Sequence, residues 1–117
     1  MDHKEMEVWK KSMLLAEVVY DLTKNFPDNE RFGLTSQIRR AVVSVPSNIA
    51  EGAARMSDKE FIRFLSIAMG SLSEVETQYH LALRFGFVER NKRIEKLIDS
   101  SRGLIIGTRN YLLKKAV

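Results

Sequence analysis

The sequence predicts an all-α protein that folds as an antiparallel, up-down-up-down four-helix bundle. Only two prolines and six glycines occur in 117 residues, and residues of good helix propensity dominate. Apolar residues recur at steps of three and four in four long segments. The joints between the segments are short, which favours antiparallel neighbours. Residues 1–117 are therefore expected to form one domain.

The first segment, residues 5–26, carries two adjacent apolar stripes. The stripes are Val8, Leu15, Val18, Leu22 and Phe26 in one row and Trp9, Met13, Ala16 and Tyr20 in the other. Together they are wider than a two-stranded seam requires, so this helix is expected to pack against two neighbours. Pro27 ends the segment.

The second segment, residues 34–55, contains a proline in its interior. Thr35 is the expected N-cap of this helix. Pro46 lacks the N–H that would bond the carbonyl of Val42, and its ring crowds that turn. The sequence therefore predicts a helix that is kinked at Pro46.

Two polar residues follow this proline at or near the apolar face. Asn48 is expected to satisfy the carbonyl that Pro46 leaves free, and Glu51 to pair with an arginine. A ligand-binding role for the two side chains is the alternative.

The third segment, residues 57–85, has the strongest periodicity in the chain. Ser57 and Glu60 match a capping box. A heptad seam then follows, formed by Phe61, Leu65, Ala68, Leu72, Val75, Tyr79 and Ala82. The small residues Gly70, Ser71 and Ser73 suggest close packing against a neighbouring helix.

The third segment also carries apolar side chains outside its seam. They are Ile62, Phe64, Ile67, Met69, Leu81 and Leu83. Either this helix is the central one of the bundle, or its outer face meets another subunit. We favour a subunit contact, because each helix of a four-helix bundle leaves one side to solvent.

The fourth segment covers residues 91–116 and has apolar residues along one face. It follows a connection in which Gly86 is expected to adopt the left-handed conformation that ends the third helix.

The sequence offers no pattern for catalysis, for a metal or for a cofactor. It has no cysteine, and the only arrangement near a di-metal motif is a single pair, Glu76 and His80. His3 is expected to lie in a frayed terminus. No signal peptide and no apolar run of about 20 residues occur. We therefore expect a non-enzymatic cytoplasmic protein with no membrane contact.

The charge is unevenly distributed. Residues 1–30 have four basic and seven acidic side chains, whereas residues 31–117 have 15 basic and eight acidic ones. The basic bulk is compatible with binding to phosphates. Interleaved acidic residues favour instead a solvated surface with weak ion pairs, and most aromatic residues lie on the apolar stripes rather than on a stacking platform.

Two stretches of the sequence carry a family resemblance. The chain reads LTSQIRRAVVSVPSNIAEGAAR from Leu34 to Arg55 and KEFIRFLSIAMGSLSEVETQ from Lys59 to Gln78. It resembles the four-helix bundle family encoded by intervening sequences of bacterial 23S ribosomal RNA genes, also called S23-like proteins. The resemblance covers essentially the whole chain and implies a homopentamer without enzymatic activity. A related branch acts as the accessory protein of diversity-generating retroelements, where it binds reverse transcriptase and nucleic acid.

The resemblance also singles out residues. Its signature falls on Arg39, Arg40, Pro46, Ser47, Asn48, Glu51, Gly52 and Arg55, and then on Phe61, Gly70, Ser71, Glu74 and Gln78. We expect four of the polar and helix-breaking residues to shape the kinked helix pair and the subunit contacts, namely Pro46, Asn48, Glu51 and Glu74. The candidates for phosphate contact are Arg39, Arg40, Arg55 and Arg63.

Two functions follow as hypotheses. The first is a homo-oligomeric accessory protein that associates with RNA or DNA, and with a reverse transcriptase if the gene is linked to a retroelement. The alternative is a protein-protein interaction scaffold with no nucleic-acid role. A metal or small-molecule site in the bundle core is a third reading.

Overall fold

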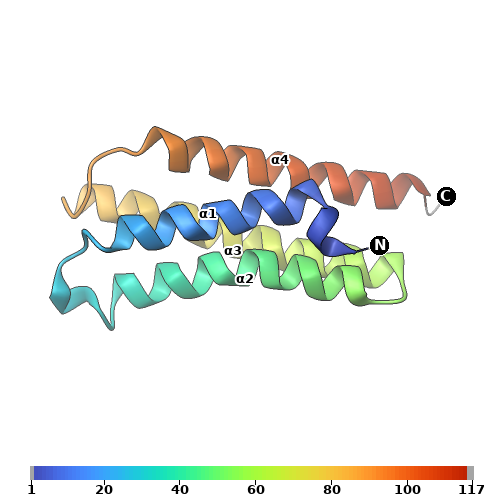
Figure 1. Cartoon of the computed structure of the whole chain (residues 1–117), viewed down its shortest axis with the longest axis horizontal. Coiled ribbons are helices and arrows are strands. Elements are labelled where there is room, and N and C mark those ends of the chain that lie inside the picture. Colours follow the sequence, from blue (N-terminus) through green and yellow to red (C-terminus); the bar gives the residue numbers. More distant parts are fainter. Residues whose placement is uncertain (1, 116–117) are drawn as a thin grey trace.

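The computed structural model describes residues 2–115 and contains four α-helices in that range. They are α1 (Glu7–Thr23), α2 (Leu34–Ala54), α3 (Asp58–Arg84) and α4 (Lys92–Lys115), with short 3-10 helices η1 (His3–Glu5) and η2 (Asp28–Glu30). No strand occurs among these residues. The molecule measures 49 × 24 × 20 Å, and its helices lie along the longest dimension (Figure 1). The predicted all-α four-helix fold is confirmed.

The four helices pack in the order in which they occur in the chain. α1 and α3 each lie beside α2 and α4, whereas the backbones of the two diagonal pairs do not approach as closely. The most extensive contact is between α2 and α3. Ser44 of α2 meets Ser71 of α3, and Gly52, two turns later in α2, lies against Phe64, two turns earlier in α3. The chain therefore runs in opposite directions in these two helices.

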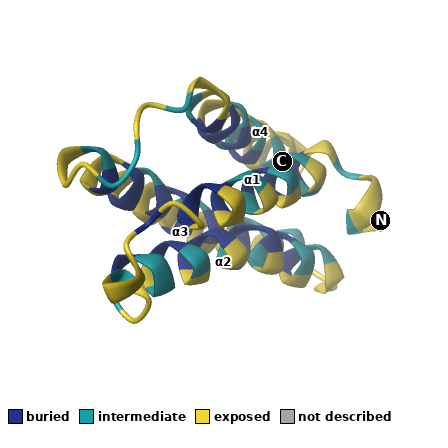
Figure 2. Ribbon diagram, turned by 60° about the vertical axis from the view of Figure 1, so that its left-hand side comes forward, coloured by how far each residue is buried: buried dark blue, intermediate teal, exposed yellow. Residues whose placement is uncertain are grey.

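The core lies along the facing sides of the four helices (Figure 2). Its largest fully buried side chains include Leu15 of α1, Ile38 and Ile49 of α2, Leu65, Leu72 and Tyr79 of α3, and Ile94, Ile98 and Ile105 of α4. All but one of the α3 seam residues are buried, and Phe61 is partly buried. The heptad pattern therefore identifies the buried face of α3.

The helix ends agree in part with the predicted signals. Ser57 is the N-cap of α3 and accepts a hydrogen bond from the backbone N–H of Glu60 at 3.3 Å, while the Glu60 carboxylate pairs with Arg63 instead of closing a capping box. Gly86 has φ 76°, which confirms the left-handed conformation. The expected end of the fourth segment, Ala116, lies outside the described residues.

The expected N-cap of the second helix is wrong. α2 begins at Leu34, so Thr35 lies inside the helix. The backbone N–H of Leu34 donates to Oε1 of Glu30 at 3.0 Å. The 3-10 turn η2 places this carboxylate at the helix start, where free N–H groups attract an acceptor.

The environment of Pro46 differs from expectation in one detail. α2 continues as an α-helix through Pro46, which is buried, and the kink stays a prediction. The Asn48 amide donates to the carbonyl of Ser44 at 2.8 Å and to its hydroxyl at 2.9 Å, not to the carbonyl of Val42. The expected pairing of Glu51 is confirmed, with Arg55 Nη2 at 2.9 Å from Glu51 Oε1.

The close packing predicted at Gly70, Ser71 and Ser73 is confirmed at Ser71, which is buried and meets Ser44 of α2, while the tightest backbone approach falls on Gly52, which was not predicted. Gly70 is exposed, and a Cβ placed there would meet nothing within 4 Å. At Gly52 a Cβ would lie 2.7 Å from Cβ of Phe64 and 2.9 Å from Cδ1 of Phe61. Gly52 is therefore the small residue on which the packing of this helix pair depends.

Much of the additional apolar surface predicted for α3 is covered within the bundle. Phe64 is buried, and Ile62, Met69 and Leu83 pack partly buried against the core. Only Ile67 and Leu81 remain exposed, at 41% and 36%. The subunit contact expected on this face stays a prediction.

Candidate functional site

The four candidate arginines lie in two groups at opposite ends of α2. Arg39 and Arg40 are near its start, whereas Arg55 follows its last residue and Arg63 lies on the first turns of α3. At 1.5 Å of rise per residue, Arg39 and Arg55 are separated by roughly 24 Å along the helix. The structure does not bring the four side chains together.

The second group is already paired with carboxylates. The guanidinium groups of Arg55 and Arg63 lie 4.9 and 4.7 Å from the ring centroid of Phe64. Arg55 pairs with Glu51, and Arg63 pairs with Glu60 at 3.0 Å. The hydrogen bond from Arg63 lowers the pKa of Glu60. These exposed pairs fit the solvated surface that the mixed charges predict.

The first group lacks carboxylate partners. Arg39 Nε donates to Thr23 Oγ1 at 2.8 Å, and its guanidinium lies 4.6 Å from the ring centroid of Tyr20, which holds it against α1. Arg40 is exposed. Arg31, in the connection before α2, lies 5.3 Å over the ring of Phe32. None of the three arginines has a carboxylate within 4.0 Å among the residues that the structure describes.

These arginines share an open groove of about 500 Å³, which we call the arginine groove. It is lined by Tyr20, Arg31, Phe32, Thr35, Ser36, Arg39, Arg40 and Val43. The Phe32 side chain is 87% exposed. Sequence reasoning overlooked this aromatic residue, although its position after Pro27 and outside both apolar stripes was a signal.

A second groove of about 440 Å³ opens on the other side of α2, against α3. We call it the polar groove; it is lined by Phe32, Ser36, Gln37, Arg40, Ala41, Ser44, Ser71, Glu74 and Gln78. The hydroxyls of Ser44 and Ser71 are 2.8 Å apart, and Asn48 extends this hydrogen-bonded chain. Of the residues expected to shape the helix pair, Glu74 lies exposed on the wall, and Asn48 donates to Ser44, which also lines the groove.

A third groove, of about 660 Å³, lies between the outer faces of α1 and α2. This apolar groove is lined by His3, Trp9, Met13, Ala16, Glu17, Tyr20, Val43, Pro46, Ser47 and Ala50. The second stripe of α1 therefore opens toward the outside instead of packing fully on a helix of the same chain. His3, expected in a frayed terminus, lies in η1 with its ring centroid 5.2 Å from that of Trp9.

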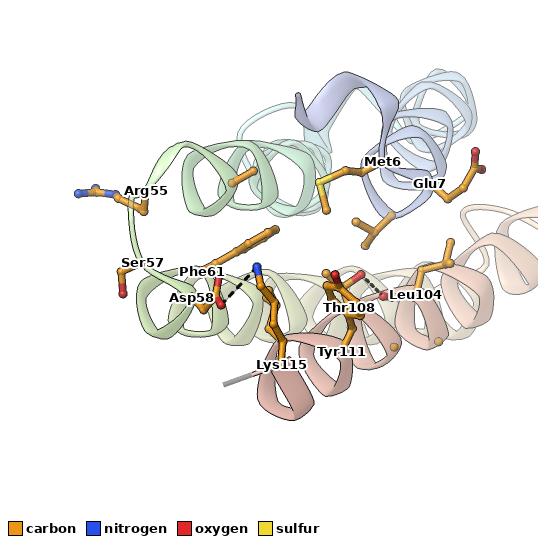
Figure 3. A pocket seen from close by; sticks show the side chains of 15 residues that line it. Met6, Glu7, Arg55, Ser57, Asp58, Phe61, Leu104, Thr108, Tyr111 and Lys115 are labelled. Carbon is orange, nitrogen blue, oxygen red and sulfur yellow. Dashed lines mark hydrogen bonds and ion pairs between the residues drawn. The ribbon is translucent and has the colours of Figure 1, made fainter. Parts of the chain in front are cut away.

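A cleft of about 540 Å³ lies at the end of the bundle where α1 and α3 begin and α4 ends (Figure 3). Met6, Phe61 and Leu104 contribute apolar surface to it. Lys115 pairs with Asp58 at 3.6 Å across this end. Arg55 and Glu7 point away from the cleft in Figure 3. Because Lys115 and Asp58 neutralise each other, the cleft offers mainly apolar contacts to a ligand.

The connection between α3 and α4 is fixed by a polar network. The Tyr79 hydroxyl accepts from the backbone N–H of Asn91 at 2.8 Å and donates to Glu95 Oε2 at 2.7 Å. Arg90 binds both oxygens of Glu95, at 2.7 and 3.2 Å. The hydrogen bonds from Arg90 and then Tyr79 lower the pKa of Glu95 to about 2, and burial raises the pKa of Tyr79. The network is an anchor for the chain reversal.

Two further findings concern residues 2–115. No three His, Asp or Glu side chains come together there in a way that could hold a metal ion. Glu76, one half of the pair considered for metal binding, is bonded to Arg102 at 2.6 Å. No helix in the same range is long and apolar enough to span a membrane.

The fold and these grooves define the class of protein, a four-helix bundle whose candidate sites are open surface grooves. Residues 4–107 match the 23S rRNA-intervening sequence protein family, and the chain belongs to that family. This confirms the family that the sequence resembles.

A solved structure supports the same fold. The chain is similar to a protein of unknown function from the S23 ribosomal protein family of Bacteroides thetaiotaomicron, with a TM-score of 0.63 and 24% sequence identity. The match covers 92% of this chain and 95% of that protein. No curated protein matches the chain.

Proposed function

We propose that this chain is a non-enzymatic, homo-oligomeric four-helix bundle protein that associates with nucleic acid in the cytoplasm as an accessory protein. The observation that carries the proposal is the arginine groove, where three arginines without a carboxylate within 4.0 Å among the described residues line the same groove as an exposed aromatic ring. The expected assembly, from the family resemblance, is a pentamer.

The chemistry of the arginine groove suits a single strand. Arg31 and Arg40 carry positive charge that no carboxylate in the described residues neutralises, so both are available to phosphates. Phe32 offers a face on which an unpaired base can stack, an interaction worth about 1–3 kcal/mol per base. Arg39 is held by Thr23 and Tyr20 and so contributes a fixed charge.

The apolar groove supports self-association. Trp9, Met13 and Val43 present a continuous apolar lining that polar residues barely interrupt. Apolar surface of this kind is commonly covered by a partner, and a second copy of the chain is the partner that a homo-oligomer supplies. Association with a reverse transcriptase belongs to this proposal only where the gene is linked to a retroelement.

The test compares two double variants of equal net charge. Arg31→Gln with Arg40→Gln removes two unpaired cations, and Arg55→Gln with Arg63→Gln removes two paired ones. Fluorescence anisotropy with labelled single-stranded RNA and DNA over a range of salt measures affinity and its salt dependence. The first variant should reduce the slope of log K against log salt by about 1.4, at about 0.7 per phosphate contact, while the second leaves it near the wild-type value. Equal behaviour of the two variants contradicts the assignment of the groove.

The alternative function, a protein-only scaffold, is favoured by the same apolar groove. It predicts an oligomer in light scattering that binds neither RNA nor DNA even at low salt, where phosphate contacts are strongest. Absence of strand binding by the wild-type oligomer would select this alternative.

A further inference from the structure

A further pocket, of about 420 Å³, lies at the corner where α1 ends and α2 begins. We call it the corner pocket; it is lined by Thr23, Lys24, Phe26, Pro27, Asp28, Arg31, Thr35 and Arg39. Arg31, Thr35 and Arg39 also line the arginine groove, so the pocket adjoins that groove. The connection between α1 and α2 crosses this end of the bundle (Figure 1), and its residues bound the pocket there.

Cations outnumber carboxylates in the corner pocket. Lys24, Arg31 and Arg39 line it together with one carboxylate, that of Asp28, so three positive charges and one negative charge leave an excess of two positive charges. Glu30, the other acidic residue of the connection, does not line the pocket, and its Oε1 accepts from the first N–H of α2. A concave site with such an excess attracts an anion.

Arg39 is held in place before any ligand arrives. Its Nε donates to Thr23 Oγ1 at 2.8 Å, and the Thr23 hydroxyl in turn donates to the carbonyl of Tyr20 at 2.8 Å. The bond to Thr23 uses Nε, so the two terminal nitrogens of the guanidinium are the donors that a ligand can reach. A side chain that is already ordered loses little conformational entropy when it binds.

The other two cations can turn to a ligand at little cost. Lys24 Nζ is 3.6 Å from Asp21 Oδ1, and both side chains are more than 70% exposed, at 73% and 79%. An exposed ion pair of this kind is weak, so an anion in the pocket can replace Asp21 as the partner of Lys24. Arg31 lies over the ring of Phe32. The end of α1, the connection and α2 therefore each supply one charged donor.

These donors suit a terminal phosphate better than a phosphate inside a strand. A terminal phosphate is a monoester, with a charge of about −1.5 to −2 at pH 7 and three acceptor oxygens. It is joined to the strand on one side only, whereas an internal phosphate has chain on both sides. Because the connection bounds the corner pocket, the arginine groove is the side on which the strand can continue.

We propose that the corner pocket binds the terminal phosphate of a single strand, with Lys24, Arg31 and Arg39 donating to its oxygens and the adjoining nucleotides in the arginine groove. The inference rests on the proposed function, since it states which part of a strand the arginine groove holds. It adds a property that the proposed function does not contain, a preference for strands with a phosphorylated end.

The experiment compares single strands of one sequence that differ only at their ends. The strands are labelled internally and carry a phosphate at the 5′ end, at the 3′ end or at neither, and fluorescence anisotropy measures their affinity for the full chain. We expect one phosphorylated strand to bind about tenfold more tightly than the unphosphorylated strand, as charge-assisted hydrogen bonds to one group allow. Equal affinities for all three strands overturn the corner pocket as a phosphate site.

Lys24→Gln assigns the preference to the pocket and has a matched control. Lys10→Gln also removes an exposed lysine whose Nζ is 3.6 Å from a carboxylate three residues earlier, but Lys10 lines none of the pockets described above. Lys24→Gln should lower the preference from about tenfold to about threefold, and Lys10→Gln should retain it. A general effect of charge predicts equal results for the two variants, and that outcome overturns the site.

Asp28→Asn should change the preference in the opposite direction. It removes the one carboxylate that lines the corner pocket and therefore its repulsion of the phosphate, so the preference for the phosphorylated strand should rise above the wild-type value. A preference that stays the same or falls would contradict a phosphate at this position.

The possible results separate this inference from the proposed function. Strand binding without a preference for a phosphorylated end overturns the corner pocket and leaves the nucleic-acid function intact. No strand binding overturns the proposed function; the pocket then stands only if inorganic phosphate, but not chloride at the same ionic strength, shifts the amide resonances of Thr35 in NMR, and does so less in Lys24→Gln. Absence of both effects overturns the two proposals together.

Discussion

Substitution of Gly52 by alanine should destabilise the protein, although alanine is the better helix former. In a helix interior the change by itself favours folding by about 1 kcal/mol. Here the new Cβ would lie 2.7 Å from Cβ of Phe64, and normal carbon contacts require about 3.5–4.0 Å. Because the Phe64 Cβ is attached directly to its backbone, α2 and α3 must separate locally by about 1 Å.

The net effect follows from the larger of these two contributions. Overpacking of this kind costs about 1–3 kcal/mol, and the rigid position of the Phe64 Cβ places Gly52→Ala in the upper part of that range. After the propensity gain, we expect a loss of about 1–2 kcal/mol in the free energy of unfolding. Urea denaturation followed by circular dichroism, at one fixed protein concentration, measures it.

Gly70→Ala is the matched control for this measurement. Gly70 also lies inside a helix, but its Cβ would meet nothing within 4 Å, so alanine should stabilise by about 1 kcal/mol. The two substitutions are thus expected to have opposite signs. Stabilisation by both would show that α2 and α3 do not approach closely at Gly52.

The remaining predictions concern pH and assembly. The pKa of Glu95 is lowered from 4.5 to about 2, so its contribution to stability is present above pH 4.5 and is lost as the pH falls toward 2. The free energy of unfolding of Glu95→Gln, measured by urea denaturation, should therefore depend less on pH in that interval than that of the wild type. An unchanged pH profile would contradict the role of Arg90 and Tyr79. Met13→Glu places a charge in the apolar groove and should reduce the molar mass found by light scattering, whereas Met56→Glu, at a fully exposed position, should not. Equal molar masses for the two variants would remove the apolar groove as the subunit contact.

Sequence periodicity located the helices because the repeat of apolar residues determines which side of a helix is buried. Ser57 and Gly86 mark helix ends by local chemistry, so the sequence was sufficient for both. The prediction of Thr35 as the N-cap of α2 failed because the N–H of Leu34 is capped by Glu30, whose position depends on the turn between the helices. Local sequence does not contain that information.

The candidate sites were less predictable, because a site depends on which surfaces the fold leaves open. The spacing of Arg39 and Arg55 was sufficient to separate them, and Glu51 was expected to pair with an arginine, but the contact of Arg55 with the ring of Phe64 depends on packing against α3. Phe32 is apolar and Gln78 is polar, yet the structure exposes the first and buries the second. Residue type alone indicated neither the exposure of Phe32 nor the burial of Gln78.

The α2–α3 pair combines a close helix approach at Gly52 with a chain of hydrogen-bonded, part-buried polar side chains. Asn48, Ser44 and Ser71 satisfy one another, which rigidifies the contact, whereas Gln78, two turns beyond Ser71, is left with an unmatched oxygen. A rigid pair cannot easily rearrange to bring a partner to that oxygen. The oxygen of Gln78, which has no partner among the described residues, is therefore a local exception in a helix contact whose other polar groups are satisfied.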